Sequence, residues 1–129
     1  MLNYFDKKNE IKSLKEELTH AFQGINPEKL RVRIGELEAE QNAEGFWNDV
    51  ERAQKVSKEL SQLTSKISKF EKLLAELDDA LETVDIVELE NSEEEDEALV
   101  KRVARLSEEV ECTPAMSSVR AGAARSSTA

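Results

Sequence analysis

Apolar residues between residues 50 and 89 recur at alternating spacings of three and four, with no Gly or Pro among them. Polar and charged residues fill most of the intervening positions. A narrow apolar seam with a period of 3.5 residues on a solvated helix is typical of a coiled coil. We therefore predict one helix over about residues 50–89, whose seam other helices must cover. The seam residues are Ala53, Val56, Leu60, Leu63, Ile67, Phe70, Leu74, Leu77, Leu81 and Val84.

Three shorter stretches repeat this apolar spacing, and we predict helices over residues 6–23, 27–41 and 93–111. We expect the second and the last of these to pack antiparallel to the long helix, and the first to lie beside the second. The predicted fold class is all-α. It is an elongated antiparallel helical bundle, or coiled coil, around one long helix at about residues 50–89.

Turn and capping residues mark the break between the first two helices. Gly24 suits a left-handed residue after a helix, Asn26 is a preferred N-cap, and Pro27 then falls at the first helical position. Gly35 lies inside the second helix, where it either weakens the helix or lets a neighbouring helix approach closely.

Two further helix starts carry the spacing of a capping box, in which the N-cap side chain and a Glu three residues later satisfy each other's backbone N–H groups. Asn48 with Glu51 predicts such a box before the long helix, and Ser92 with Glu95 predicts one before the last helix. The acidic run around Ser92 is then explained by the positive end of a helix dipole.

The corner before the long helix combines two aromatic residues, Phe46 and Trp47, with a polar start to that helix. Two interpretations fit the aromatic pair: an exposed binding hot spot, or a plug that closes the end of the bundle. We favour the plug, because large apolar area is usually buried first. The candidate site residues of this corner are Phe46, Trp47, Asn48, Asp49, Glu51 and Arg52.

The chain changes character at residue 112. All 28 acidic residues and 16 of the 18 basic residues lie in residues 1–111, which therefore carry a net charge of −12. Residues 112–129 are rich in Ser and Ala, contain no acidic residue and show no apolar periodicity. We predict one helical domain over residues 1–111, and a disordered tail over residues 112–129 that is foreign to it.

Little in the sequence points to catalysis. The chain has one His, one Cys, no glycine-rich phosphate loop and no Cys/His set with metal-ligand spacing. We therefore predict that the chain is not an enzyme and has no catalytic, cofactor-binding or metal site. Its net charge argues against nonspecific nucleic-acid binding and favours a protein partner. No membrane-spanning run or signal peptide is found, and the single Cys112 fits a reducing compartment, so we expect a cytoplasmic protein.

Three stretches of the chain resemble one known family. The corner Gly45-Phe46-Trp47-Asn48-Asp49 is followed by Glu51-Arg52-Ala53-Gln54-Lys55-Val56, and Pro27-Glu28-Lys29-Leu30 with Ile34-Gly35-Glu36-Leu37-Glu38 precede it. Over about residues 1–111 the sequence resembles the N-terminal helical domain of the bacterial peptide chain release factor 2 family. Val50 departs from this pattern, since the family often has Pro there.

This resemblance implies a role in translation termination. Full-length members recognise UGA and UAA stop codons on the ribosome through a Ser-Pro-Phe tripeptide, and they trigger peptidyl-tRNA hydrolysis through a Gly-Gly-Gln loop. Neither motif occurs in these 129 residues. The resemblance therefore implies a truncated release factor that retains only the module contacting protein at the stalk base of the large ribosomal subunit. The alternative is a free-standing structural coiled coil that self-associates through the Ala53–Val84 seam.

Overall fold

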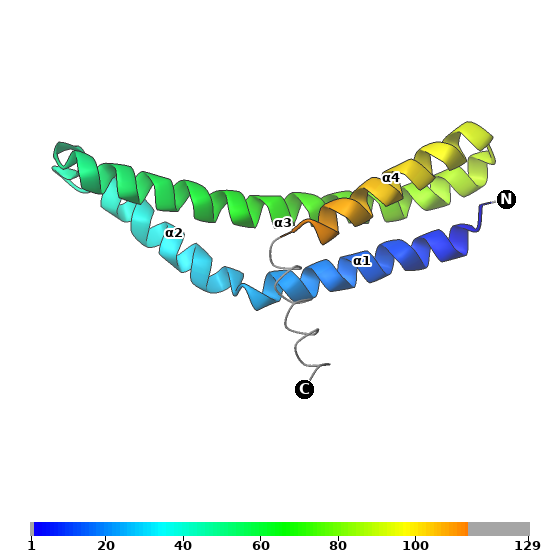
Figure 1. Cartoon of the computed structure of the whole chain (residues 1–129), viewed down its shortest axis with the longest axis horizontal. Coiled ribbons are helices and arrows are strands. Elements are labelled where there is room, and N and C mark those ends of the chain that lie inside the picture. The colour runs from blue at the N-terminus through cyan, green and yellow to red at the C-terminus, as the bar shows by residue number, and fades with distance from the viewer. Residues whose placement is uncertain (1, 114–129) are drawn as a thin grey trace. The chain divides into compact units, whose positions relative to one another are not determined.

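The computed structural model describes residues 2–113, which form four α-helices and one short 3-10 helix (Figure 1). No strand occurs within that range, so the predicted all-α fold is confirmed. No helix of the described range is long and apolar enough to cross a membrane. The prediction of a disordered tail falls almost entirely on residues 114–129, which lie outside the described residues. In chain order the helices are α1 (Tyr4–Gly24), α2 (Pro27–Gln41), η1 (Phe46–Asn48), α3 (Val50–Glu90) and α4 (Glu93–Glu111).

The helix ends lie close to the predicted ones. α2 and α4 begin and end at the predicted residues, and α3 extends one residue further, to Glu90. α1 begins earlier than predicted, at Tyr4, because the side-chain oxygen of Asn3 accepts a hydrogen bond from the backbone N–H of Asp6 at 3.1 Å. That bond satisfies one of the N–H groups that every helix start leaves free.

The break between α1 and α2 places its left-handed residue elsewhere than predicted. Gly24 remains the last residue of α1, and Asn26 instead has a positive φ of 54°. Asn is one of the few residues other than Gly that enter this region readily. Asn26 also accepts a hydrogen bond from the N–H of Lys29 at 3.4 Å, and Pro27 opens α2, so the predicted N-cap and proline position are confirmed.

Neither predicted capping box forms. Asp49, rather than Asn48, caps α3, since its carboxylate accepts a hydrogen bond from the N–H of Arg52 at 3.2 Å. Asn48 belongs to η1, which leaves the extended backbone needed at an N-cap to the next residue. Ser92 does occupy the N-cap of α4, but its side chain makes no capping bond. The spacing of residues does not determine which side chain turns back toward the backbone.

The described residues divide into two compact units. The hairpin unit, residues 26–70, contains α2, η1 and the first half of α3. The three-helix unit, residues 2–25 and 71–113, contains α1, the second half of α3 and α4. Each unit has its own buried side chains.

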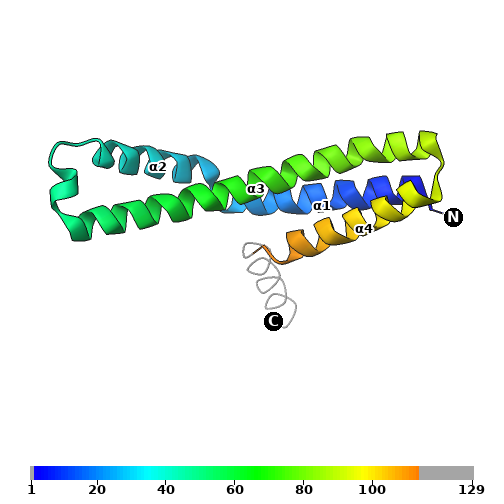
Figure 2. The ribbon, with the colours of Figure 1, turned by 90° about the horizontal axis from the view of Figure 1, so that it is seen from above.

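In the three-helix unit, α1 and α4 lie side by side along the second half of α3 (Figures 1 and 2). α1 runs antiparallel to α3, because Lys15 near its middle pairs with Asp78 at 2.5 Å, and Lys8 near its start pairs with Asp85 near the end of α3. α4 runs antiparallel to α3 as predicted. The prediction that the first helix lies beside the second is wrong, since α1 shares its unit with α4 and not with α2.

The buried residues explain why α1 belongs with α4. Four apolar residues of α1 and four of α4 are buried, and a third stripe on α3 faces them, so three amphipathic helices cover one another. α2 has a single buried residue, Leu37, and so offers a much smaller apolar face. The core of this unit consists of Ile11, Leu14, Leu18, Ala21, Leu77, Ala80, Val84, Val87, Leu99, Val103, Leu106 and Val110.

The buried face of α3 departs here from the predicted seam. Leu74 and Leu81 are only half-buried, whereas Ala80 and Val87, which the seam leaves out, are buried. A strict 3.5-residue seam suits a helix with one partner. In this unit α3 has two partners, α1 and α4, and therefore buries a wider face.

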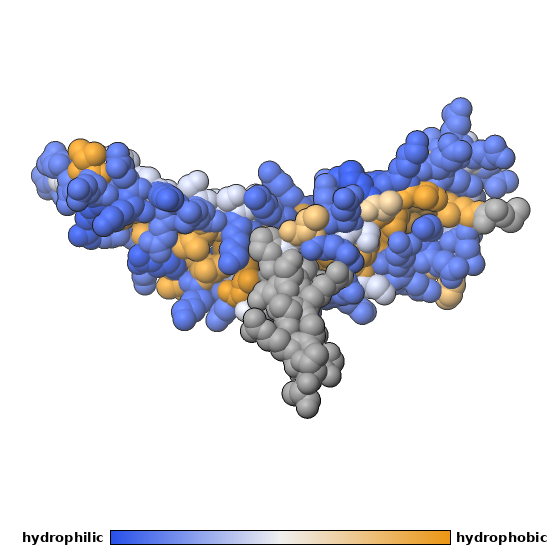
Figure 3. Space-filling view, in the orientation of Figure 1, coloured by the Kyte–Doolittle hydropathy of each residue, from blue (hydrophilic) through white to orange (hydrophobic). Residues whose placement is uncertain are grey.

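In the hairpin unit, α2 runs antiparallel to the first half of α3, and η1 closes the end where they join (Figure 1). Leu37, Phe46, Ala53 and Val56 form its core cluster, and two half-buried leucines of α3 pack against it. Two helices cover less apolar surface than three. In Figure 3, apolar surface accordingly shows in patches between hydrophilic side chains on the face in view.

Candidate functional site

The corner of the hairpin unit, residues 42–52, is built by short-range backbone hydrogen bonds. The N–H of Phe46 donates to the carbonyl of Ala43, and the N–H of Asn48 donates to the carbonyl of Gly45. Gly45 has a φ of +82°, a left-handed conformation that strains any residue with a Cβ. The chain therefore reverses direction in one tight turn and presents the two aromatic residues directly after it.

The two aromatic side chains of the corner have opposite environments. Phe46 is 7% exposed and belongs to the core cluster, whereas Trp47 is 65% exposed. Their rings contact edge to face, with centroids 4.9 Å apart and planes at 87°. The plug interpretation is confirmed for Phe46 and wrong for Trp47. Phe46 holds the indole ring of Trp47 in place from inside the unit.

The other predicted site residues all lie exposed around this pair. Asn48 ends η1, Asp49 caps α3, and Glu51 and Arg52 belong to the first turn of α3. The structure adds Val50, which is 62% exposed and follows Trp47 by three residues. In the sequence, the one signal at Val50 is that it stands where the family that the chain resembles often has Pro. Val50 adds a second exposed apolar side chain to the corner.

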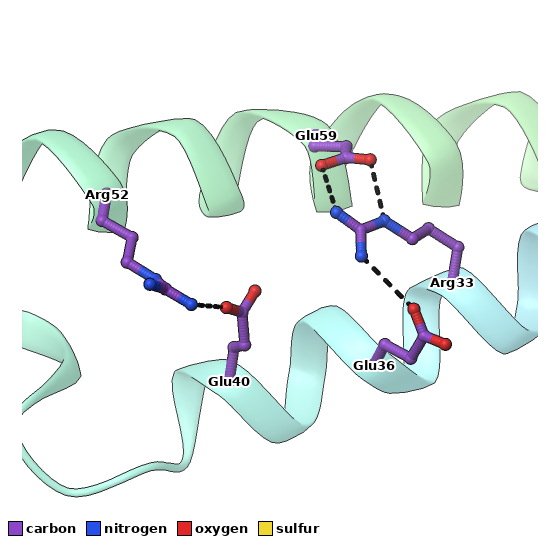
Figure 4. A network of polar contacts seen from close by, with 5 residues as sticks. All are labelled: Arg33, Glu36, Glu40, Arg52 and Glu59. Carbon is purple, nitrogen blue, oxygen red and sulfur yellow. Dashed lines mark hydrogen bonds and ion pairs between the residues drawn. The ribbon is translucent and has the colours of Figure 1, made fainter.

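Ion pairs link α2 to α3 near the corner and further along the hairpin (Figure 4). Arg52 in the first turn of α3 pairs with Glu40 near the end of α2. Further along, the guanidinium of Arg33 donates to both carboxylate oxygens of Glu59, at 3.0 and 3.1 Å, and to Glu36 at 3.3 Å. Such two-bond contacts fix geometry as well as adding attraction. Arg52 therefore acts within the corner as a brace between the two helices.

The contact between Arg33 and Glu59 also changes how both groups titrate. The hydrogen bonds from Arg33 hold the pKa of the Glu59 carboxyl below its ordinary value. The bonds to Glu59, and secondly to Glu36, raise the pKa of the Arg33 guanidinium. Both groups are therefore charged at neutral pH, and the pair links α2 to α3 there.

The corner exposes both apolar and polar side chains. Trp47 and Val50 supply apolar area, and the acidic and amide side chains beside them form a polar rim. Within residues 2–113, no group of three or more His, Cys, Asp and Glu side chains could hold a metal ion. Exposed apolar area beside polar side chains is a composition that protein-contact surfaces share.

The net charge is distributed unevenly between the two units. Residues 26–70 contain eight acidic and eight basic residues, so the hairpin unit is neutral overall. Residues 2–25 and 71–113 contain 20 acidic and eight basic residues, so the described part of the three-helix unit carries −12. The candidate corner therefore belongs to the neutral unit.

Comparison with known proteins gives one consistent result. The model of the PCRF domain matches residues 30–119, which include the candidate corner and eight residues of the predicted foreign tail. Peptide chain release factor 2 of Campylobacter jejuni (strain 81-176) is 31% identical over 100 residues, which are 78% of this chain and 27% of that protein. No solved structure matches the chain.

Two further relatives carry the same name. Peptide chain release factor 2 of Clostridium perfringens is 32% identical over 103 residues, covering 80% of this chain and 28% of that protein. The protein of that name from Wolinella succinogenes is 35% identical over 86 residues, covering 67% of this chain and 23% of its own length. The chain thus spans about a quarter of the relatives it matches. On the strength of the match over residues 30–119, the chain belongs to the PCRF domain family.

Proposed function

We propose that this chain is a ribosome-contacting module of the release-factor type, which binds protein at the stalk base of the large ribosomal subunit. The proposal rests on the similarity to release factor 2 proteins and on one structural observation. Within the family-matched residues, Trp47 is fixed by Phe46 at a braced corner and yet is 65% exposed. Trp is among the residues most enriched at the energetic centres of protein interfaces.

The corner residues take distinct roles in this proposal. Trp47 and Val50 enter an apolar pocket on the partner, while Asn48 and Glu51 contact its polar rim. Phe46, Asp49 and Arg52 position the corner and do not themselves carry the affinity. The polypeptide chain itself neither reads a stop codon nor hydrolyses peptidyl-tRNA, since its 129 residues contain neither of the two motifs that the resemblance assigns to those steps.

The charge of the chain favours protein over RNA as the direct partner. The described part of the three-helix unit carries −12, and phosphate repels such a surface. A basic protein surface attracts it over long distances, and added salt screens that attraction. We therefore expect association to slow as salt rises, while the dissociation rate, which depends on the apolar corner, changes much less.

Binding to isolated stalk-base protein, free of ribosomal RNA, tests this function. The wild-type chain should bind, and Trp47→Ala should weaken binding by at least about tenfold, as expected for an interface anchor. Val32→Ala is the matched control, because Val32 is 63% exposed in the same unit but lies on α2, away from the corner. Binding that requires RNA, or equal losses in the two variants, would refute the proposal.

A stop-codon-dependent peptide release assay supplies a second test. The chain alone should release no peptide from ribosomes stalled at UGA or UAA. Full-length release factor 2 serves as the positive control in the same reaction. Release by this chain above the background rate would contradict its assignment as a contact module without termination activity.

The alternative function, a coiled coil that self-associates through the predicted seam, draws support from Leu60 and Leu63. Both are half-buried in the hairpin unit, so part of the seam remains open. Most of the seam is covered within the chain, however, because Ala53, Ile67 and Leu77 are among its buried members. Sedimentation at several concentrations separates the two functions. We expect a monomer throughout, and a concentration-dependent dimer would favour the coiled coil.

A further inference from the structure

We propose that one end of the three-helix unit is a second docking surface, which binds a basic amphipathic helix of another protein. This acidic end consists of the first turn of α1, the last turns of α3 and the first two turns of α4. It belongs to the three-helix unit, whereas the corner with Trp47 belongs to the hairpin unit. The inference is therefore independent of the proposed ribosome contact.

Contacts within the unit bring these three helix ends together. The hydroxyl of Tyr4 at the start of α1 donates to the carboxylate of Asp96 in the first turn of α4, at 2.5 Å. Lys8, one turn further along α1, pairs with Asp85 near the end of α3. Asn91 and Ser92 connect the end of α3 directly to α4. Segments distant in sequence thus meet at one end of the unit.

Exposed apolar side chains gather at this end. The exposed large apolar residues of the described part of the unit are Phe5 at 71%, Ile86 at 56%, Leu89 at 87% and Val100 at 39%, and all four belong to the acidic end. Ile86 and Leu89 are three residues apart and so share one face of α3. This face is opposite to the one that buries Val84 and Val87, so both side chains stay exposed. Neighbouring exposed apolar residues such as these two mark an interaction site more strongly than scattered ones.

Carboxylates surround these apolar residues. The sequence has no Lys or Arg between Lys72 and Lys101, a stretch that contains twelve acidic residues. Six of them are exposed close to the turn between α3 and α4, namely Glu88, Glu90, Glu93, Glu94, Glu95 and Glu97. An apolar surface with an acidic rim complements a helix that has apolar residues on one face and Lys or Arg beside them.

The same charges disfavour other occupants. A second copy of the chain would bring two strongly acidic ends together, and like charges oppose that contact. Nucleic acid and anionic membranes carry the same sign of charge as this surface and are repelled. A basic amphipathic helix both neutralises the carboxylates and covers Ile86 and Leu89.

The test uses the whole chain and a defined probe, a fluorescein-labelled 18-residue peptide of Leu and Lys arranged as an amphipathic helix. A scrambled peptide of identical composition, with Leu distributed around the helix, is its control. Fluorescence anisotropy should show at least about tenfold tighter binding of the amphipathic peptide. Equal affinity for both peptides would reduce the effect to charge alone and overturn the proposal.

Surface variants locate the binding. Leu89→Gln should weaken peptide binding severalfold, and the double variant Ile86→Gln with Leu89→Gln by about tenfold. Val32→Gln, which alters an apolar residue of the neutral unit that is 63% exposed, should have no effect. Both changed positions are exposed and helical, and circular dichroism should confirm unchanged helicity. Wild-type binding by the double variant, or an equal loss in Val32→Gln, would overturn the proposal.

Charge variants test the contribution of the carboxylates, and Trp47→Ala tests whether the two surfaces of the chain bind independently. Neutralising Glu90, Glu94 and Glu97 to Gln should weaken binding and flatten its salt dependence more than neutralising Glu38, Glu44 and Glu51 in the hairpin unit. Trp47→Ala should leave peptide binding unchanged, so failure of the corner and failure of this surface are distinguishable. A dimer that the double variant dissociates would identify a second copy as the occupant and contradict the proposal.

Discussion

Single side chains in this chain owe their properties to one or two contacts, and Tyr4 is the clearest case. Its hydrogen bond to Asp96, with secondary contributions from burial and the neighbouring carboxylates, raises the pKa of the phenol to about 12. The neutral phenol is the form that the fold favours. Its contribution to stability is therefore fully present below the ordinary tyrosine pKa of about 10, and it is lost as the pH rises through about 12.

Because Tyr4 is the only tyrosine, its ionisation can be followed directly by ultraviolet absorbance. We expect a titration midpoint near 12 in the wild-type chain. Asp96→Ala should lower it toward the ordinary value, and Glu94→Ala, which removes a nearby carboxylate without a bond to Tyr4, should change it little. A wild-type midpoint equal to that of Asp96→Ala would show that the bond between α1 and α4 is absent in solution.

Glu59 is a second case at the residue scale, in which the pKa is lowered rather than raised. Its pKa is lowered by the hydrogen bonds from Arg33, so its stabilising effect is present above the ordinary Glu pKa and is lost as the pH falls through the lowered value. Glu59→Gln should therefore reduce the melting temperature at neutral pH and have little effect at strongly acidic pH. Glu38→Gln, an exposed change on α2, is the control. A pH-independent difference between Glu59→Gln and wild type would contradict the ion pair.

At the scale of elements, Asn48 and Asp49 are two neighbouring candidates for the N-cap of α3, and the structure assigns the cap to Asp49. Asp49→Ala should cost about 1 kcal/mol of stability, because it removes the acceptor for the Arg52 N–H. Asn48→Ala should cost much less, since Asn48 belongs to η1 and does not cap α3. Chemical denaturation of the two variants decides between them. A larger loss of stability in Asn48→Ala would instead support the capping box that the sequence predicts.

A second prediction at the scale of elements concerns Gly35 in α2. A Cβ at Gly35 would meet nothing within 4 Å, so close helix approach does not explain this glycine. Gly35→Ala should therefore stabilise the chain by about 0.5–1 kcal/mol through helix propensity. Gly45→Ala should destabilise it, because Gly45 has a φ of +82°. Denaturant unfolding measures both changes, and a loss of stability in Gly35→Ala would show a neighbour that the structure lacks.

The helices themselves could be predicted from the sequence, because apolar spacing, Pro27 and the small set of capping residues are local signals. Their partners were harder to predict. An apolar seam indicates that a helix must pack against others, but it does not identify which helices those are. The sequence therefore predicts α1 beside α2, whereas α1 packs with α4. Ala80 and Val87 were missed for the same reason, since a second partner widens the buried face. At the candidate site, sequence pattern selected Phe46 and Trp47 together, but only the fold separates the buried ring from the exposed one.

At the scale of the whole molecule, charge and apolar exposure are divided between the two units. The hairpin unit is neutral and exposes Trp47 and Val50 at its corner, whereas the three-helix unit carries −12 in its described residues and exposes apolar side chains at its acidic end. Two surfaces of such different character suit two different partners. For the first of them, the corner, we propose a contact with protein at the stalk base of the large ribosomal subunit.

Photocrosslinking from the corner tests that claim most directly. A photoreactive benzoylphenylalanine in place of Trp47 keeps a large aromatic side chain at the exposed position, and the same residue in place of Val32 is the control. After irradiation with intact large ribosomal subunits, mass spectrometry identifies what each position contacts. We predict that the Trp47 position crosslinks to protein of the stalk base and that the Val32 position does not. Crosslinks from the Trp47 position only to ribosomal RNA, only to proteins elsewhere on the subunit, or to nothing at all would contradict the account.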